Sequence, residues 1–194
     1  MLIRTFSGVN VEGPVDIAGY WEDRMNHDLY RLMLGMCSAI FHNANSAIDV
    51  GCYTSGLIVE MDWIKKRVAT DLKSYLSDNW RSVKGVDFIG GDAFNLKFDQ
   101  QFDLVISNQT VEHLEDPASF VNKLLSIGKG LIISTTYQTP AGLIEGHIQD
   151  PIDMQKFLSW FPVDIDSYTI CHHPLNKKIG HIIAVINKSH PNNK

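Results

Sequence analysis

The stretch Ala47–Gly56, which reads AIDVGCYTSG, constrains the fold of this chain more than any other. Its apolar residues form a short run that is typical of a strand covered on both faces, and Asp49 interrupts that run near its end. Gly51 and Gly56 then predict a tight turn, and Leu57–Met61 predicts the first turn of a helix. Backbone N–H groups at such a junction face a ligand, because ligands of open parallel sheets bind beyond the carboxyl ends of the strands.

Three further strands are predicted to reach the same edge of the sheet. Ile64–Leu72 ends near Asp71, 22 residues after Asp49, where an acidic side chain is placed to hold a ribose. Val86–Ile89 leads into Gly90, Gly91, Asp92 and Ala93, and Phe102–Ser107 leads into Asn108 and Gln109. Polar or glycine-rich loops therefore gather at one edge, as in a cofactor-binding enzyme.

These segments resemble the successive motifs of class I S-adenosylmethionine-dependent methyltransferases of the small-molecule, type 11-like kind. The motifs are DVGCYTSG, VATDL, FIGGDAFNL, FDLVISNQTVEHLEDP and GLIISTTY, and the resemblance covers residues 46–136. It implies that the cofactor is S-adenosylmethionine. It also implies the positions of the cofactor-binding residues: Asp49, Gly51, Cys52 and Tyr53 near the methionine part, Asp71 and Leu72 near the ribose, Asp92 and Ala93 near the adenine, and Asn108 and Gln109 near the methyl donor.

The glycine turn departs from the family pattern, which resembles D-x-G-x-G-x-G. Tyr53 and Ser55 stand where the family usually has glycine. A residue with a Cβ atom is strained at positive φ, and a bulky one more so. We therefore expect either that the loop follows another path using Gly56 or that Tyr53 covers the cofactor in a different way.

Composition narrows the functional classes. The chain has 194 residues with 44% hydrophobic and 20% charged residues, which suits one well-buried domain. The formal net charge of −5 argues against a dedicated nucleic-acid partner, because no basic excess is available to neutralise phosphates. No apolar run is long enough for a membrane span, and the N-terminus has no signal-peptide core. Three cysteines without a C-x-x-C pair predict neither a disulfide framework nor a metal site, so we expect a cytoplasmic protein.

The predicted fold is one α/β domain over residues 1–194. It is a Rossmann-like three-layer sandwich with a mostly parallel seven-stranded sheet and an antiparallel C-terminal hairpin strand. Residues 1–45 are expected to form an arm and a helical cover, with the helix over 20–42 on the substrate side. Residues 46–136 form the predicted cofactor-binding core, and residues 137–187 the substrate-side loop and last strands.

Two helix starts are predicted from Asp-Pro pairs. Asp116 caps a helix that begins at Pro117, and Asp150 caps a helix over residues 152–161. Between the two lies a long polar loop, YQTPAGLIEGHIQDP, and loops of that length inside a compact domain are usually functional.

Histidines supply the candidate acid–base residues. His147 lies in the long loop, and imidazole side chains are the usual acid–base groups near neutral pH, so His147 is the predicted base, with His113 as the competitor beside the methyl-donor loop. Each also has a purely structural alternative, as a histidine that only shapes or locks its loop. The pair His172–His173 lacks a third ligand and predicts a solvated loop, so no metal site is expected. Trp80 is interpreted either as a border of the adenine pocket or as a surface-packing residue.

The predicted function is methyl transfer to a small-molecule acceptor, with an oxygen of a sugar or other metabolite preferred. The alternative is a binding or scaffold protein that keeps the nucleotide-binding sheet without the chemistry. A nicotinamide oxidoreductase is disfavoured because the turn lacks G-x-G-x-x-G spacing. Methylation of nucleic-acid amines is also disfavoured, because Asn108–Val111 does not resemble the [DN]-P-P-[YFW] motif of those enzymes.

Overall fold

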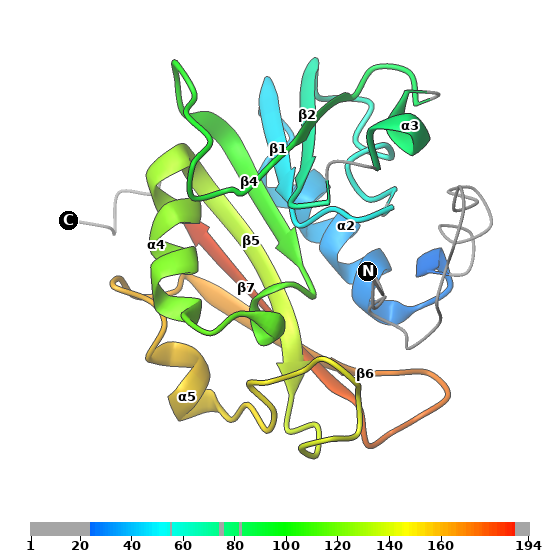
Figure 1. The fold of residues 1–194 in the computed structure, drawn as a ribbon, viewed down its shortest axis with the longest axis vertical. Helices are drawn as coiled ribbons and strands as arrows, with labels where there is room; N and C mark the ends of the chain where they lie inside the picture. Colours follow the sequence, from blue (N-terminus) through cyan, green and yellow to red (C-terminus); the bar gives the residue numbers. More distant parts are fainter. Residues whose placement is uncertain (1–23, 55, 74–75, 82, 189–194) are drawn as a thin grey trace.

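The structure is a computed structural model that describes residues 24–54, 56–73, 76–81 and 83–188. Seven strands form one sheet in the order β3-β2-β1-β4-β5-β7-β6 (Figure 1). They are β1 (Ser46–Val50), β2 (Lys66–Asp71), β3 (Asp87–Gly90), β4 (Phe102–Asn108), β5 (Gly128–Tyr137), β6 (Ser167–His172) and β7 (Gly180–Asn187).

Strands β1 to β6 run in one direction, and β7 runs in the opposite direction between β5 and β6. β1 pairs with β2 and β4, β2 with β3, and β4 with β5, all in parallel. β7 runs antiparallel to both β5 and β6. The parallel strands therefore deliver their carboxyl ends to one edge, which confirms the predicted Rossmann-like sheet with an antiparallel C-terminal hairpin.

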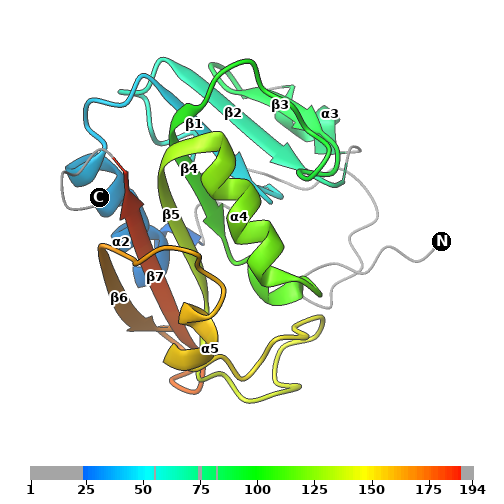
Figure 2. The ribbon, with the colours of Figure 1, turned by 90° about the vertical axis from the view of Figure 1, so that its left-hand side faces the viewer.

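Helices cover both faces of the sheet, which gives three layers. Figure 2 shows α4 (Pro117–Ile127) in front of the sheet and α2 (Asp28–Ile40) behind it. The short helices are α3 (Ser77–Trp80) and α5 (Met154–Leu158), and η2 (Val111–His113) is a single 3-10 turn after β4. Alternate strand residues enter opposite cores: Leu104 and Ile106 pack on the α2 side, and Val105 packs on the α4 side.

The helix expected directly after the glycine turn does not form. Residues 57–60 make turns, with Glu60 N–H bonded to Gly56 O at 3.2 Å, and no regular helix follows before β2. Gly56, Ile58 and Val59 are weak helix formers, so burial of the apolar side chains on the sheet decides the path. Those buried side chains are Leu57, Ile58, Met61 and Ile64.

Helix caps were predicted correctly in one case and wrongly in the other. Asp116 caps α4, accepting the N–H of Ser119 at 2.9 Å. The cap of α5 is Asp153, which accepts the N–H of Lys156, so the prediction for Asp150 was wrong.

Within the described residues, no helix is both long and apolar enough to cross a membrane. Residues 1–23 of the predicted arm and helical cover lie outside the described residues.

Candidate functional site

The turn at the end of β1 brings two loops into direct contact. Gly51 adopts φ +78°, and a Cβ atom there would lie 2.4 Å from Oγ1 of Thr110 in the loop after β4. Only glycine leaves room for this close approach and takes this conformation without strain. The ends of β1 and β4 therefore form one continuous wall.

Tyr53 holds the next part of the turn in a left-handed conformation, with φ +44°. Its N–H donates to Asp71 Oδ2 at 2.9 Å, and its carbonyl accepts from Nε1 of Trp80 at 2.8 Å. The Lys73 Nζ atom lies 4.9 Å from the centre of its ring. These contacts fix Tyr53 at a position that the family pattern gives to glycine. Ser55 lies outside the described residues.

Trp80 is a core residue in this arrangement. It is buried and stacks on Phe88, with ring centres 6.0 Å apart. Both interpretations of Trp80 as a pocket border or a surface residue were therefore wrong, and its role is to support the Tyr53 turn.

Two adjoining cavities lie at the carboxyl edge of the sheet, and Gly51 and His113 line both. The smaller, of about 180 Å³, is lined by the predicted cofactor residues Asp71, Leu72, Asp92 and Ala93. The larger, of about 290 Å³, is lined by the rest of the predicted set, Asp49, Cys52, Tyr53, Asn108, Gln109 and His147. The structure thus brings every sequence-predicted site residue to one of the two cavities.

Asp49 is an unusual feature of the larger cavity. Its side chain is 1% exposed, and neither carboxylate oxygen accepts a hydrogen bond from any residue that the structure describes. Burial, and then the negative charge of Asp71, raises the pKa of Asp49 to about 8. A buried carboxylate without a partner is costly, so this position suits a ligand group that is cationic or donates hydrogen bonds.

Asp71 is already engaged by the protein. Besides Tyr53 N–H, it accepts the N–H of Lys73 at Oδ1, at 2.9 Å. A carboxylate has about four acceptor sites, so it retains capacity for ribose hydroxyls. Leu72, the next residue, is 73% exposed and forms an apolar border of the smaller cavity.

The loop after β4 contacts the C-terminal hairpin. Gln109 adopts φ +51°, and its Oε1 bonds with Nδ1 of His181 at 3.1 Å. Asn108 Oδ1 accepts a hydrogen bond from Ser134 Oγ on β5 at 2.5 Å. Burial, and then the neighbouring histidines, lowers the pKa of His181 to about 4. This wall therefore presents amide and neutral imidazole groups.

The long loop after β5 is docked on η2. The N–H groups of Ile148 and Gln149 both donate to the carbonyl of Glu112, at 3.1 and 3.2 Å. Nδ1 of His113 bonds with the carbonyl of Gly146 at 2.9 Å. Burial is the main reason that the pKa of His113 falls to about 4. His113 thus lines both cavities and also locks the loop, as its structural alternative predicted, while its role as a base stays a prediction.

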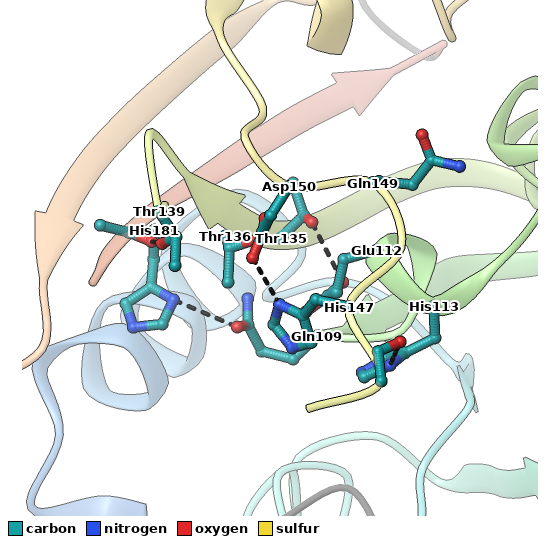
Figure 3. Close-up of polar contacts among 12 residues, drawn as sticks. Gln109, Glu112, His113, Thr135, Thr136, Thr139, His147, Gln149, Asp150 and His181 are labelled. Carbon is teal, nitrogen blue, oxygen red and sulfur yellow. Dashed lines mark hydrogen bonds and ion pairs between the residues drawn. The ribbon is translucent and has the colours of Figure 1, made fainter. Parts of the chain in front are cut away.

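His147 forms a buried pair with Asp150 (Figure 3). Its Nδ1 lies 2.8 Å from Asp150 Oδ2, with the two side chains 6% and 1% exposed. Asp150 Oδ1 accepts from Oγ1 of Thr136 at 2.5 Å. The rings of His147 and His113 meet edge to face, with centres 4.6 Å apart. Asp150 therefore orients the imidazole that the sequence predicts as the base, in place of capping a helix.

Glu112 lies beneath these histidines, and the predicted site did not include it. It is 0% exposed; Oε2 accepts from Oγ1 of Thr135 at 3.0 Å, and Oε1 accepts no hydrogen bond from the described residues. Burial raises its pKa to about 7, against an opposing effect of His147. Ligand atoms of Glu112, His113 and His147 all lie within 4.8 Å of one another.

Several other residues of the larger cavity were not predicted as site residues. They come from the segment before α2, the first turn of α2, the β6–β7 hairpin loop and β7, and they are Arg24, His27, Tyr30, His173 and His181. His173 lies partly exposed in the loop after β6, as predicted, and its ring packs edge to face on that of His27, with ring centres 4.7 Å apart. The sequence did carry one sign of these residues: His27 and Tyr30 lie three residues apart near the start of the predicted cover helix, so they share one face of it.

Comparisons with known sequences agree with this arrangement. Residues 48–129 match the family described as a methyltransferase domain. No curated protein matches the chain.

Solved structures share the fold. N-methyltransferase NodS from Bradyrhizobium japonicum WM9, crystallised with S-adenosylhomocysteine, is 11% identical with a TM-score of 0.69, covering 90% of this chain and 95% of that one. An S-adenosylmethionine-dependent methyltransferase from Clostridium acetobutylicum ATCC 824 is 13% identical with a TM-score of 0.66, covering 88% and 96%. The plantazolicin methyltransferase BpumL, crystallised with a desmethylPZN analog and S-adenosylhomocysteine, is 12% identical with a TM-score of 0.63, covering 88% and 89%.

Proposed function

We propose that this chain is a class I S-adenosylmethionine-dependent methyltransferase and that it methylates a hydroxyl oxygen of a small-molecule acceptor. The match of residues 48–129 to the methyltransferase-domain family and the strand order of the sheet support this proposal. The observation that carries the proposal is the buried His147–Asp150 pair in the wall of the larger cavity, next to the loop that follows β4. A hydroxyl acceptor gains from a group that withdraws its proton as the methyl group is transferred.

The cavities fit the cofactor. The smaller one joins an exposed apolar side chain, Leu72, to the polar groups of Asp71 and Asp92, which suits an adenosine. Because Gly51 has no side chain where it packs against Thr110, its backbone is accessible to a ligand at the boundary between the two cavities. Beyond it lies the unpaired carboxylate of Asp49, which suits the ammonium of the methionine part. When bound, S-adenosylmethionine supplies a sulfonium methyl group, which the acceptor oxygen takes while the C–S electron pair passes to sulfur.

The remainder of the larger cavity is proposed to hold the acceptor. Its walls contribute a guanidinium, imidazoles and a phenol from Arg24, His27, Tyr30, His173 and His181. Such a polar lining suits a hydroxylated metabolite such as a sugar. The docked loop and α2 exclude water from opposite sides, which favours alignment of the acceptor with the methyl group.

His147 is proposed to activate the acceptor. A carboxylate accepts hydrogen bonds only, so Nδ1 of His147 carries the proton in its bond to Asp150 and the lone pair of the neutral ring lies on Nε2. His113 has the same tautomer, because its Nδ1 bonds to the carbonyl of Gly146. Both lone pairs are thereby fixed by partners on the opposite side of each ring.

The test combines binding and turnover. Calorimetry should show that S-adenosylhomocysteine binds the purified protein, and hydroxylated metabolites should be screened as acceptors with radiolabelled S-adenosylmethionine. His147→Ala should lower kcat by roughly 10²–10⁴-fold and leave S-adenosylhomocysteine affinity unchanged. His172→Ala, a change at an exposed histidine outside the cavities, is the matched control. Near-normal kcat in His147→Ala at every pH would remove this residue from the chemistry.

A further inference from the structure

Three potential metal ligands converge where the docked loop meets η2. Glu112, His113 and His147 each offer a ligand atom, and these atoms lie within 4.8 Å of one another. Ligands bound at about 2.0–2.2 Å to one tetrahedral zinc ion lie about 3.3–3.6 Å apart, so closing on an ion needs the ligand atoms to approach one another by about 1 Å through side-chain shifts. The docking of residues 146–149 on η2 already fixes the two backbones relative to each other.

Both histidines are oriented as metal-ligating histidines usually are. Such a histidine donates its other ring N–H to a carboxylate or a backbone carbonyl, which fixes the ring and its tautomer. Here Nδ1 of His147 bonds to Asp150 and Nδ1 of His113 bonds to the carbonyl of Gly146. Asp150 is itself held by Thr136. Each ring therefore directs the Nε2 lone pair away from its supporting partner.

Glu112 supplies an independent observation. It is fully buried, and its Oε1 atom accepts no hydrogen bond from any residue in the described part of the chain. Thr135 holds only the other oxygen. An unsatisfied buried carboxylate oxygen is costly, and coordination of a cation would compensate that cost.

We propose that Glu112, His113 and His147 bind a divalent cation of the Zn²⁺ or Mn²⁺ type. One carboxylate and two imidazoles form a donor set that suits such ions, and three protein ligands leave coordination positions open. His113 and His147 line the larger cavity, so the open positions face the acceptor. The spacing of the ligands, two adjacent residues and one 34 positions later, matches no short sequence motif, which is why the sequence predicted no metal site.

The catalytic consequence rests on the proposed function. A hydroxyl bound to the cation is more acidic than a free one, so its proton passes to solvent as the oxygen coordinates. The oxygen then forms the O–CH₃ bond, and the S–CH₃ bond breaks with its electron pair on sulfur. On this route Nε2 of His147 coordinates the ion and does not itself take the proton, and Asp150 acts as a positioning residue.

The experiment titrates MnCl₂ or ZnCl₂ into chelator-treated, full-chain protein by calorimetry. Wild type should bind one equivalent, and Glu112→Gln and His113→Ala should each weaken binding at least about tenfold. Asp150→Asn should weaken it roughly 10–100-fold, the usual effect of losing the partner of a metal-ligating histidine. His172→Ala should bind as wild type does. Melting temperature and S-adenosylhomocysteine affinity identify any variant that fails to fold.

Each outcome decides the proposal. Absence of saturable binding of either cation by folded, S-adenosylhomocysteine-competent wild type would overturn it, as would equal affinity in wild type, Glu112→Gln and His113→Ala. Methyl transfer that survives thorough EDTA treatment would overturn the catalytic role of the cation and leave the proposed function standing. Stoichiometric binding at this cluster in a protein that methylates no hydroxyl acceptor would support the metal site and overturn the proposed function.

Discussion

Replacing Asp49 with asparagine tests whether its buried carboxyl group binds a cationic group of the ligand. The pKa of Asp49 is raised from 3.8 to about 8, chiefly by burial. In the free protein at pH 6.5 the carboxyl group is therefore almost entirely protonated. An ammonium placed against it favours the ionised form, so binding of S-adenosylhomocysteine at pH 6.5 should release close to one proton.

The same shift predicts an effect on stability, and its sign is fixed by linkage. A carboxyl group whose pKa is higher in the folded state adds stability that is fully present below about pH 4. That stability is lost as pH rises through about 8. Asp49→Asn removes the penalty, so its free energy of unfolding should equal that of wild type near pH 4 and exceed it at pH 8.5. At about 1.4 kcal/mol per pKa unit, the ceiling is about 6 kcal/mol, and a gain of a few kcal/mol is expected.

The assay is calorimetry at pH 6.5 in two buffers of different ionisation enthalpy, together with urea unfolding of the free protein at both pH extremes. Wild type should release roughly 0.9 proton on binding S-adenosylhomocysteine and Asp49→Asn none. At pH 8.5, where the wild-type carboxylate is ionised, the variant should bind roughly 10–100-fold more weakly. If wild type releases no proton and the two proteins are equally stable at pH 8.5, then Asp49 is not a protonated, unpaired carboxyl in solution, and the reasoning is refuted.

Two further changes test the wall around the cofactor cavity. Gly51→Ala should lower the free energy of unfolding by about 1–3 kcal/mol and weaken S-adenosylhomocysteine binding. The reason is that the new Cβ atom would lie 2.4 Å from Thr110 Oγ1 at a left-handed φ. An unchanged melting temperature and an unchanged affinity would contradict this. Asp71→Ala should weaken S-adenosylhomocysteine binding by about 1.5–3 kcal/mol, as calorimetry would measure. It should also lower the free energy of unfolding in urea, because Asp71 accepts hydrogen bonds from the backbones of Tyr53 and Lys73. Loss of affinity without loss of stability would mean that Asp71 contributes only to ligand binding.

Regular elements of the sheet were predictable because their signals are local. Apolar runs, and the loops that end them, predict β1, β2, β3 and β4 to within a few residues. Asp116 predicts the start of α4 because its side chain caps the first turn. The predicted cofactor residues reach the cavities because the ends of parallel strands must meet at one edge. Their individual roles stay predictions.

The features that the sequence did not reveal depend on contacts between distant segments. Asp150 reads locally as a helix cap, yet it pairs with His147 because the loop docks on η2. Glu112 becomes a site residue only when Thr135 and the two histidines surround it. His181 reaches the ligand edge from the start of a strand that runs against the others. Residue spacing along the chain carries none of this information.

The antiparallel direction of β7 divides the binding edge between separate parts of the gene. In the parallel strands the residues that reach this edge come last, whereas in β7 they come first, at Gly180 and His181. The β6–β7 hairpin therefore borders the larger cavity from a part of the chain that is separate from β1 and β2, which end at the predicted cofactor residues. With the acceptor placed in the larger cavity, as proposed, we expect exchange of this C-terminal hairpin to change acceptor choice while Asp71 and Asp92 stay in place.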